Sequence, residues 1–181
     1  MKISDVRNDM IECSQLKIHR NGSQSVYMQH DKKNVSLQTD TVSAVDITTC
    51  DIKFNCSPEL AHTLRTFDEI ALRDANHRSL EWFGKELDHD VIDKLFAPTV
   101  NVNNGVTAKL IDTDIFAKSK HIIDSSRIHK GCPCIFILEL LGVYFAKKRF
   151  GLTWNVKQIL AAPENTISGY AFDDDIIVPI I

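Results

Sequence analysis

Two long runs of strand-forming residues, 135–145 and 152–160, follow one another with only a short basic turn between them. The second run alternates apolar and polar residues from Leu152 to Leu160, which is the period of a half-buried strand. The first run contains Gly142, and a glycine inside a long strand is typical of a strongly bent strand. Together with other short strand patterns, a bent hairpin favours a small, partly open barrel over a flat sandwich.

Shorter strand patterns occur elsewhere in the chain, in residues 14–56, 100–110, 115–116 and 121–123. Asn21-Gly22 is a turn signal between the first two strands of the N-terminal group. Asn104-Gly105 divides the 100–110 segment and predicts a hairpin with a type I′ turn.

A helical period separates the two strand groups. Ser57-Pro58 is typical of a helix start, with a hydroxyl cap followed by a proline whose missing N–H costs nothing there. Apolar residues then recur at helical spacing, at Leu60, Leu64, Phe67 and Ala71. We expect this helix to reach about Leu80, and a short second helix to begin at Asp88 and end before Pro98.

The composition excludes several classes of protein. Apolar residues make up 44% and charged residues 25%, an ordinary globular balance that excludes a collagen, a coiled-coil rod and a wholly disordered chain. The net charge is −3, whereas a dedicated duplex binder is usually clearly basic. Four acids and no bases lie beyond residue 163, which leaves 21 basic against 20 acidic residues in 1–163. Any nucleic-acid contact must therefore come from a local patch.

The sequence predicts neither membrane insertion nor cofactor chemistry. Its apolar runs are far shorter than a bilayer span, and its N-terminus has no apolar signal-peptide core, so we expect a cytosol-like compartment. The five cysteines have no disulfide-framework spacing, and Cys132 and Cys134 are expected as small buried residues although His129 lies nearby. No phosphate loop, nucleophile elbow or zincin motif is present, so we expect a protein that is not an enzyme and holds no metal.

The closing hairpin gathers rings and cations in one neighbourhood, namely Tyr144, Phe145, Lys147, Lys148, Arg149, Phe150 and Trp154. Aromatic rings offer faces on which unpaired bases stack, and cations neutralise phosphates, so the cluster favours a single strand. A structural interpretation stays open. Trp154 has the parity of Leu152 and Val156, which indicates a core position, and a Lys-Lys-Arg turn is also an ordinary solvated hairpin tip.

The order of these features resembles the OB-fold single-stranded DNA-binding proteins of phages and nucleocytoplasmic large DNA viruses. The resemblance covers residues 40–163 and rests on segments 43–54, 58–96, 100–110, 135–145 and 150–160. It implies an OB fold and a non-enzymatic protein that binds single-stranded DNA. Together with the strand and helix patterns, it predicts a mainly β (α+β) fold, with an OB-like barrel over residues 13–163 and a helical insertion at 57–97. Residues 1–12, which are polar and weakly patterned, are expected as an N-terminal arm. The basic and aromatic residues of the closing strands supply the candidate DNA contacts, namely Tyr144, Lys147, Lys148, Arg149, Phe150, Trp154 and Lys157.

The tail, residues 164–181, departs from that family, whose tail is long and strongly acidic. Here three acids, Asp173 to Asp175, precede an apolar end that should bury against its own body or a neighbouring subunit. The candidate docking residues are Tyr170, Phe172, Ile176, Ile177, Ile180 and Ile181. This keeps an alternative open, a minor capsid or other structural virion protein. Expected partners are single-stranded DNA and viral structural or replication proteins, in an oligomer or assembly, in the host cytoplasm, viral factory or virion.

Overall fold

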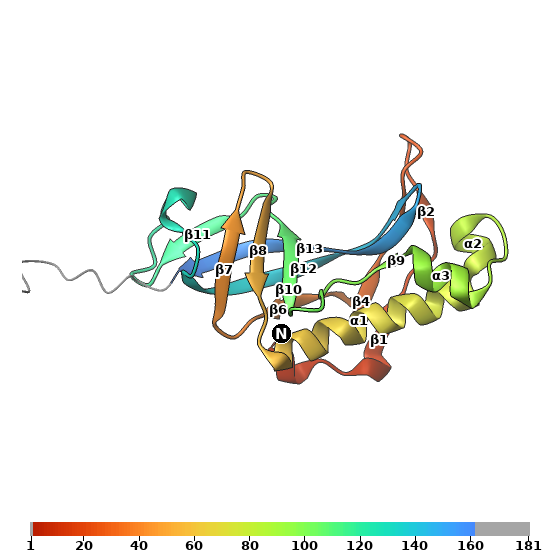
Figure 1. Cartoon of the computed structure of the whole chain (residues 1–181), viewed down its shortest axis with the longest axis horizontal. Helices are drawn as coiled ribbons and strands as arrows, with labels where there is room; N and C mark the ends of the chain where they lie inside the picture. The colour runs from red at the N-terminus through yellow and green to blue at the C-terminus, as the bar shows by residue number, and fades with distance from the viewer. Residues whose placement is uncertain (1, 162–181) are drawn as a thin grey trace, which may run out of the picture.

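A computed structural model describes residues 2–161, and the candidate docking residues of the tail, Tyr170 to Ile181, lie outside that range. The strands are β1 (Ile11–Cys13), β2 (Lys17–Ile18), β3 (Gln24–Val26), β4 (Met28–His30), β5 (Lys33–Asn34), β6 (Ser36–Gln38), β7 (Val42–Ile47), β8 (Asp51–Asn55), β9 (Phe96–Ala97), β10 (Gly105–Lys109), β11 (Asp114–Ala117), β12 (Pro133–Ala146) and β13 (Arg149–Ala161). The α-helices are α1 (Pro58–His77), α2 (Ser79–Phe83) and α3 (His89–Leu95), with short 3₁₀ turns at Ile3–Asp5, Asn8–Met10 and Ser125–Arg127. Figure 1 shows the long β12–β13 ribbon running along the molecule, with α1 lengthwise beneath it.

Within residues 2–161, five strands close into a ring in the spatial order β7, β8, β10, β13 and β12, with β12 pairing back to β7. Only the contact between β10 and β13 is parallel within this ring. In chain order the ring reads first, second, third, fifth and fourth strand, which is the order of the OB barrel. The fold is therefore mainly β with an OB-like barrel, as expected.

A buried amide completes the weakest contact of the ring. β10 and β13 share a single register pair, Lys109 with Asn155. The Asn155 side chain is 2% exposed, accepts a hydrogen bond from Ile111 N–H at 2.9 Å and donates one to Ile111 O at 3.2 Å. A side-chain amide thus continues the backbone pairing where the chain leaves β10, and it leaves no polar group of its own unsatisfied.

Two bulges bend the β12–β13 ribbon. The register between the strands shifts between Leu140 and Gly142, and again opposite Lys157. Gly142 has φ of +124°, and a Cβ on it would lie 2.4 Å from the Val26 carbonyl oxygen in β3. Glycine is therefore required here both by conformation and by close approach. The bend expected at Gly142 is present.

The bulge at Lys157 overturns one expectation about burial. A β-strand alternates its faces every residue, so an extra residue reverses which residues point inward. After Lys157 it is Ile159 that is fully buried, whereas Leu160, which the alternation places in the core, is 38% exposed. The outer face of the ribbon thereby acquires an additional apolar side chain.

The helical insertion covers the barrel as its period predicts. Ser57 caps α1 by accepting a hydrogen bond from Leu60 N–H at 3.1 Å. The predicted apolar stripe is fully buried, at Leu60, Leu64, Phe67 and Ala71. The helix ends at His77, a few residues before its expected limit, and α2 continues until Gly84, whose left-handed φ of 71° ends it. α3 begins after Asp88, as expected.

Residues 2–40 are part of the packed structure. Ile11 is 4% exposed, Ile3 and Val6 pack against the core, and β1 pairs with β4 in a small second sheet. β3 and β6 pair with β12 and so extend the barrel sheet. The segment expected as an arm, residues 1–12, thus contributes core contacts through its described residues.

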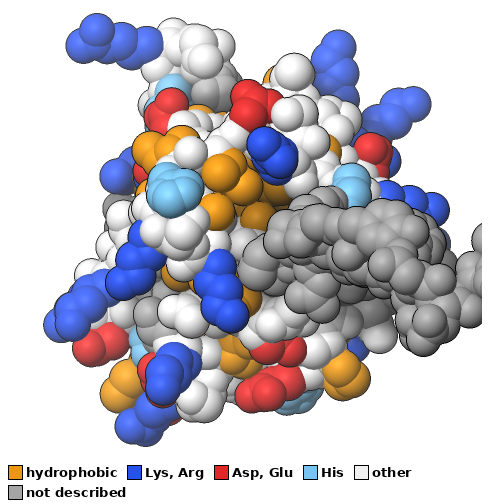
Figure 2. Space-filling view, turned by 90° about the vertical axis from the view of Figure 1, so that its left-hand side faces the viewer, with side chains coloured by type: hydrophobic (Ala, Val, Ile, Leu, Met, Phe, Trp, Pro, Cys, Tyr) orange, Lys and Arg blue, Asp and Glu red, His pale blue; other side chains and the backbone are white. Residues whose placement is uncertain are grey.

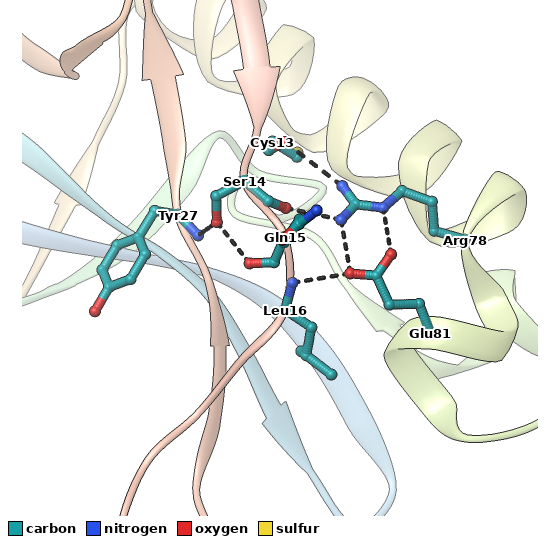
Figure 3. A network of polar contacts seen from close by, with 7 residues as sticks. All are labelled: Cys13, Ser14, Gln15, Leu16, Tyr27, Arg78 and Glu81. Carbon is teal, nitrogen blue, oxygen red and sulfur yellow. Dashed lines mark hydrogen bonds and ion pairs between the residues drawn. The ribbon is translucent and has the colours of Figure 1, made fainter.

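A polar network ties this N-terminal segment to the junction of α1 and α2 (Figure 3). The Arg78 guanidinium donates to both carboxylate oxygens of Glu81, at 2.9 and 2.8 Å, and to the Ser14 carbonyl oxygen at 2.9 Å. Glu81 in turn accepts a hydrogen bond from Leu16 N–H at 2.9 Å. The Arg78 group also lies over the Trp82 ring, 5.6 Å from its centroid. The network fixes α2, and with it Trp82, relative to the strands.

One turn differs from its expected type. The Asn21-Gly22 turn joins β2 to β3 as expected, with Gly22 N–H donating to the His19 carbonyl oxygen. At the second turn only Asn104 is left-handed, with φ of 56°, whereas a type I′ turn needs two such residues. The Asn101 side-chain oxygen accepts from Gly105 N–H at 2.8 Å, and this contact stabilises a longer loop instead.

Replacing Gly142 by alanine tests the close approach. Gly142→Ala should lower the free energy of unfolding by about 2–3 kcal/mol, because the added Cβ meets both an unfavourable φ and the Val26 carbonyl. Gly131→Ala is the matched control, since Gly131 has φ of +87° but open space around its Cα, and it should cost only about 1 kcal/mol. Urea denaturation measures both, and equal losses would contradict the clash.

Candidate nucleic-acid interface

The rings at the root of the closing hairpin form an internal aromatic cluster. Phe150 is 1% exposed and packs edge-on against Phe83 and Phe96, with ring centroids 5.2 and 5.3 Å apart. Phe145 stacks beside it at 6.3 Å, and Trp82 contacts both rings edge-on. The assignment of Phe150 as a stacking residue is therefore wrong, because α2 and the segment after α3 cover its ring.

Trp154 is also part of the core. Its side chain is 2% exposed and packs edge-on against Phe67 of α1, with centroids 5.4 Å apart. A ring enclosed in this way offers no face to a base, so its assignment as a stacking residue is wrong too. The strand parity that it shares with Leu152 and Val156 had indicated this position.

The cations of the turn do face solvent. Lys147, Lys148 and Arg149 are exposed, and none of them forms an ion pair within residues 2–161. The turn itself is tight, because Ala146 and Arg149 are register partners and only two lysines lie between them. Three unpaired positive charges therefore lie at the end of the ribbon, where they are free to meet an anion.

Of the three rings expected to stack on bases, only Tyr144 is not buried. It is half-buried and lies over Gly151, whose own Cβ would be 3.3 Å from the Tyr144 ring and 2.5 Å from the Ala97 carbonyl oxygen. The absence of a Cβ on Gly151 thus leaves room for the ring to approach the strand. Tyr144 and Arg149 both line the same open groove.

This groove has a volume of about 690 Å³ and lies over β8, β10 and β13. Its lining combines polar and charged side chains with apolar ones. The polar and charged side chains are Asp51, Thr99, Asn101, Thr107, Lys109, Tyr144, Arg149 and Thr153, and the apolar ones are Ala97, Pro98, Leu152 and the little-exposed Trp154. Lys109 forms an ion pair with Asp51 at 2.8 Å on one wall, which raises the pKa of Lys109 through that carboxylate. Apart from Tyr144 and Arg149, the polar and charged lining residues were not expected from the sequence. The available signal was strand alternation, in which the exposed Thr107 and Lys109 alternate with the buried Val106 and Ala108.

Lys157 is not part of this site. It is exposed, but it lies at the second bulge of β13, eight residues from Arg149. At ~3.3 Å per residue that is roughly 26 Å along the strand. The structure therefore brings together Tyr144, Lys147, Lys148 and Arg149, and leaves Lys157 apart.

A second hollow, of about 510 Å³, lies on the other side of the hairpin root. The aromatic cluster forms its floor, and its cations are Lys85, Lys147 and Arg149. Arg149 thus lines both hollows. Of the three rings expected to stack on bases, only Phe150 borders this second hollow, whereas Tyr144 and Trp154 border the groove.

A buried carboxyl positions one wall of the groove. Asp68 of α1 is 5% exposed and accepts hydrogen bonds from Thr99 N–H at 2.8 Å and from the Thr99 hydroxyl at 2.6 Å. Burial raises the pKa of Asp68 from 3.8 to about 6, and the two Thr99 hydrogen bonds oppose that rise only in part. Deprotonated Asp68 is therefore costly to keep buried, although it anchors the strand connection at Thr99.

The raised pKa of Asp68 gives folding stability a definite pH dependence. The folded protein binds this proton more tightly than the unfolded chain, so the stability from Asp68 is present below about pH 4 and is lost as the pH rises through 6. The unfolding free energy of Asp68→Asn should therefore rise relative to wild type by up to roughly 3 kcal/mol between pH 4 and pH 7. Urea denaturation across this range measures it, and parallel profiles would contradict the raised pKa.

Replacing Trp154 and Tyr144 by alanine, one at a time, tests which of the two rings belongs to the core. Trp154→Ala should lower the unfolding free energy by about 3–5 kcal/mol, because it empties a fully enclosed site against Phe67. Tyr144→Ala should cost no more than about 1–2 kcal/mol, because its ring is only half-buried. Chemical denaturation of the two variants gives the comparison. A Trp154 variant of wild-type stability would show that its ring is not core.

Within the described part of the chain, no cluster of three or more His, Cys, Asp or Glu side chains is arranged to hold a metal ion. Cys132 and Cys134 are buried, in line with the structural interpretation of these residues. No helix in residues 2–161 has the length and apolar character needed to cross a membrane.

Comparison with known proteins places the chain in a family. A family model described as a family of unknown function (DUF5871) matches residues 39–175, and the chain belongs to that family. No curated protein matches the sequence.

The solved structures that resemble this fold include single-stranded DNA-binding proteins of phages. One is that of bacteriophage Enc34 in a C-terminal truncation, with 8% identity, 88% of this chain and 98% of that chain covered, and a TM-score of 0.47. Another is gp2.5 of bacteriophage T7, with 9% identity, 81% and 100% covered, and a TM-score of 0.48. At these values the likeness carries no weight for function, which must be argued from the groove.

Proposed function

We propose that this protein binds single-stranded DNA in the groove over β8, β10 and β13, with the basic turn of residues 147–149 at its rim. In OB barrels the face of the second and third strands, together with the loops joining strands one to two and four to five, binds oligonucleotides and oligosaccharides. Here those strands are β8 and β10, and the loop from the fourth strand to the fifth is the Lys147-Lys148 turn.

The observation that carries the proposal is the coincidence of this face with the open groove. The groove extends from Thr107 and Lys109 on β10 to Tyr144 and Arg149 at the hairpin. A position known to suit oligomers in this barrel type is thus hollowed and carries hydrogen-bonding groups. It is bounded by the unpaired Arg149, which adjoins the two lysines of the turn. Neither the barrel nor the basic turn alone would favour a ligand as strongly.

The chemistry of the groove favours a single-stranded polyanion over a sugar or a duplex. Arg149, Lys147 and Lys148 would meet phosphates, and the accessible Tyr144 ring offers a face for one unpaired base. Thr107 and Thr153 supply hydroxyls for sugar or base edges. A neutral oligosaccharide would leave the three cations of the turn unused, and a duplex would hide its base faces from the Tyr144 ring.

Anisotropy titration of a fluorescein-labelled oligo(dT) tests the proposal at two salt concentrations. Lys147→Glu with Arg149→Glu should weaken binding at least tenfold and flatten the salt dependence, since each lost phosphate contact removes about 0.7 from the log–log slope. Tyr144→Ala should weaken binding by about 1–3 kcal/mol through loss of one stacked base. A label on the DNA is needed because both tryptophans are buried.

Lys32→Glu with Lys33→Glu is the matched control. It makes the same charge change at two lysines that line neither hollow at the hairpin, and it should alter the affinity by no more than about twofold. Thermal melts establish that each variant is folded. Unchanged low-salt affinity of the Lys147 and Arg149 variant, or equal binding of a duplex, would reject the proposed site.

A further inference from the structure

An apolar hollow lies at the opposite end of the ribbon from the basic turn, on the outer face of four neighbouring strands. Its volume is about 360 Å³. The register places Ile135 of β12, Leu160 of β13 and Phe116 of β11 side by side in one row across the sheet. Ile137 lies in the next row, between Gln38 of β6 and Gln158 of β13. These four apolar side chains share one face because residues two apart in a strand point the same way.

These side chains are incompletely covered within residues 2–161. Leu160 is 38% exposed, and Ile135, Ile137 and Phe116 are half-buried. Ile122, which forms a bridge with Phe116, is 69% exposed. Figure 2 shows hydrophobic side chains gathered in a hollow at this end of the molecule, with Lys, Arg and His side chains around it. An apolar patch with a polar rim is typical of a surface that another segment covers.

The chain itself supplies a segment of matching chemistry. Ala161 ends β13 one residue after Leu160, so the remaining twenty residues start at the edge of the hollow. Their last six, 176–181, are apolar throughout, and three consecutive acids, 173–175, precede them. Lys120 lines the hollow, and Lys118 lies in the same turn, which Lys120 N–H closes by donating to the Ala117 carbonyl oxygen at 2.8 Å. The acids and these lysines are complementary in charge.

We propose that the apolar end of the chain, residues 176–181, docks in this hollow of its own barrel, with the three acids beside Lys118 and Lys120. The eleven residues between Ala161 and Asp173 span up to ~35–40 Å when extended, which is more than enough to turn back onto the adjacent sheet face. A short tether also gives the end an effective concentration in the millimolar range. Docking on its own barrel therefore prevails over exchange with a second copy at ordinary protein concentrations. This inference does not depend on DNA binding.

Cleavage of the tail by thermolysin, which cuts before Ile and Val, tests the docking in the full chain. Leu160→Lys should increase the rate of cleavage within 176–181 at least tenfold, because a charged side chain in the hollow opposes apolar docking. Ile177→Lys, on the tail side of the contact, should likewise raise the rate of cleavage before Ile176, a site that the substitution leaves in place, and it leaves every described residue unchanged. In the unsubstituted chain, methyl NOEs between the terminal isoleucines and Leu160 or Ile137 should be present.

Val102→Lys is the matched control, because it adds a lysine at an aliphatic side chain that is 97% exposed and does not line the hollow, and it should leave the cleavage rate unchanged. Sedimentation analysis distinguishes a hollow filled by the tail of the same chain from one filled by the tail of a second copy. A monomer with a protected tail supports docking on the same barrel, whereas a dimer that dissociates when residues 173–181 are removed overturns it in favour of exchange. Equal tail cleavage in the unsubstituted, Leu160 and Ile177 chains overturns docking altogether.

Removal of residues 173–181 also tests whether the tail lies in the apolar hollow or covers the proposed DNA groove. If the tail occupies only the hollow, oligo(dT) affinity at low salt should stay within about twofold of the full chain, because the hollow shares no lining residue with the groove. A gain in affinity of tenfold or more would mean that the tail covers the groove, and would overturn the proposed location.

Discussion

The Asn155 amide is the contact on which the barrel closure depends most. The third and fifth barrel strands share one parallel register pair, and this side chain adds two hydrogen bonds to Ile111 just beyond it. Closure brings β10 beside β13, and only then do Lys109 and Thr107 face Tyr144 and Arg149 across one groove. The candidate binding surface is therefore a product of long-range closure, and not of any local segment.

Local sequence patterns predicted the elements well, because each rests on short-range physics. The Ser57-Pro58 helix start, the stripe of Leu60 and Phe67, and the bend at Gly142 are all present. What the patterns missed depends on contacts distant in sequence. Alternation could not reveal the bulge that turns Leu160 outward, and nothing near Phe150 indicates that a helix seventy residues earlier covers its ring.

The aromatic and the basic residues of the hairpin have different roles. Its rings, with Trp82 and Phe83, hold the ribbon against α2, while its cations project beyond the packed region. The sequence placed both kinds in one functional cluster because they are neighbours in the chain. In the folded protein the rings give the turn a rigid base, and only Tyr144 keeps a ring accessible to the groove. A fixed base lowers the entropy cost of presenting charges to a ligand.

The pairing of β12 with β3 and β6 determines how the chain can be shortened. The residues shared with the family start at 39, whereas β3 and β6, which pair with β12, lie before that point. A polypeptide trimmed to the shared residues would leave stretches of the longest strand as a bare edge, with unsatisfied N–H and C=O groups open to another molecule. Such a fragment would be expected to self-associate and precipitate. By pairing with β12, the strands before residue 39 would protect its edge from aggregation.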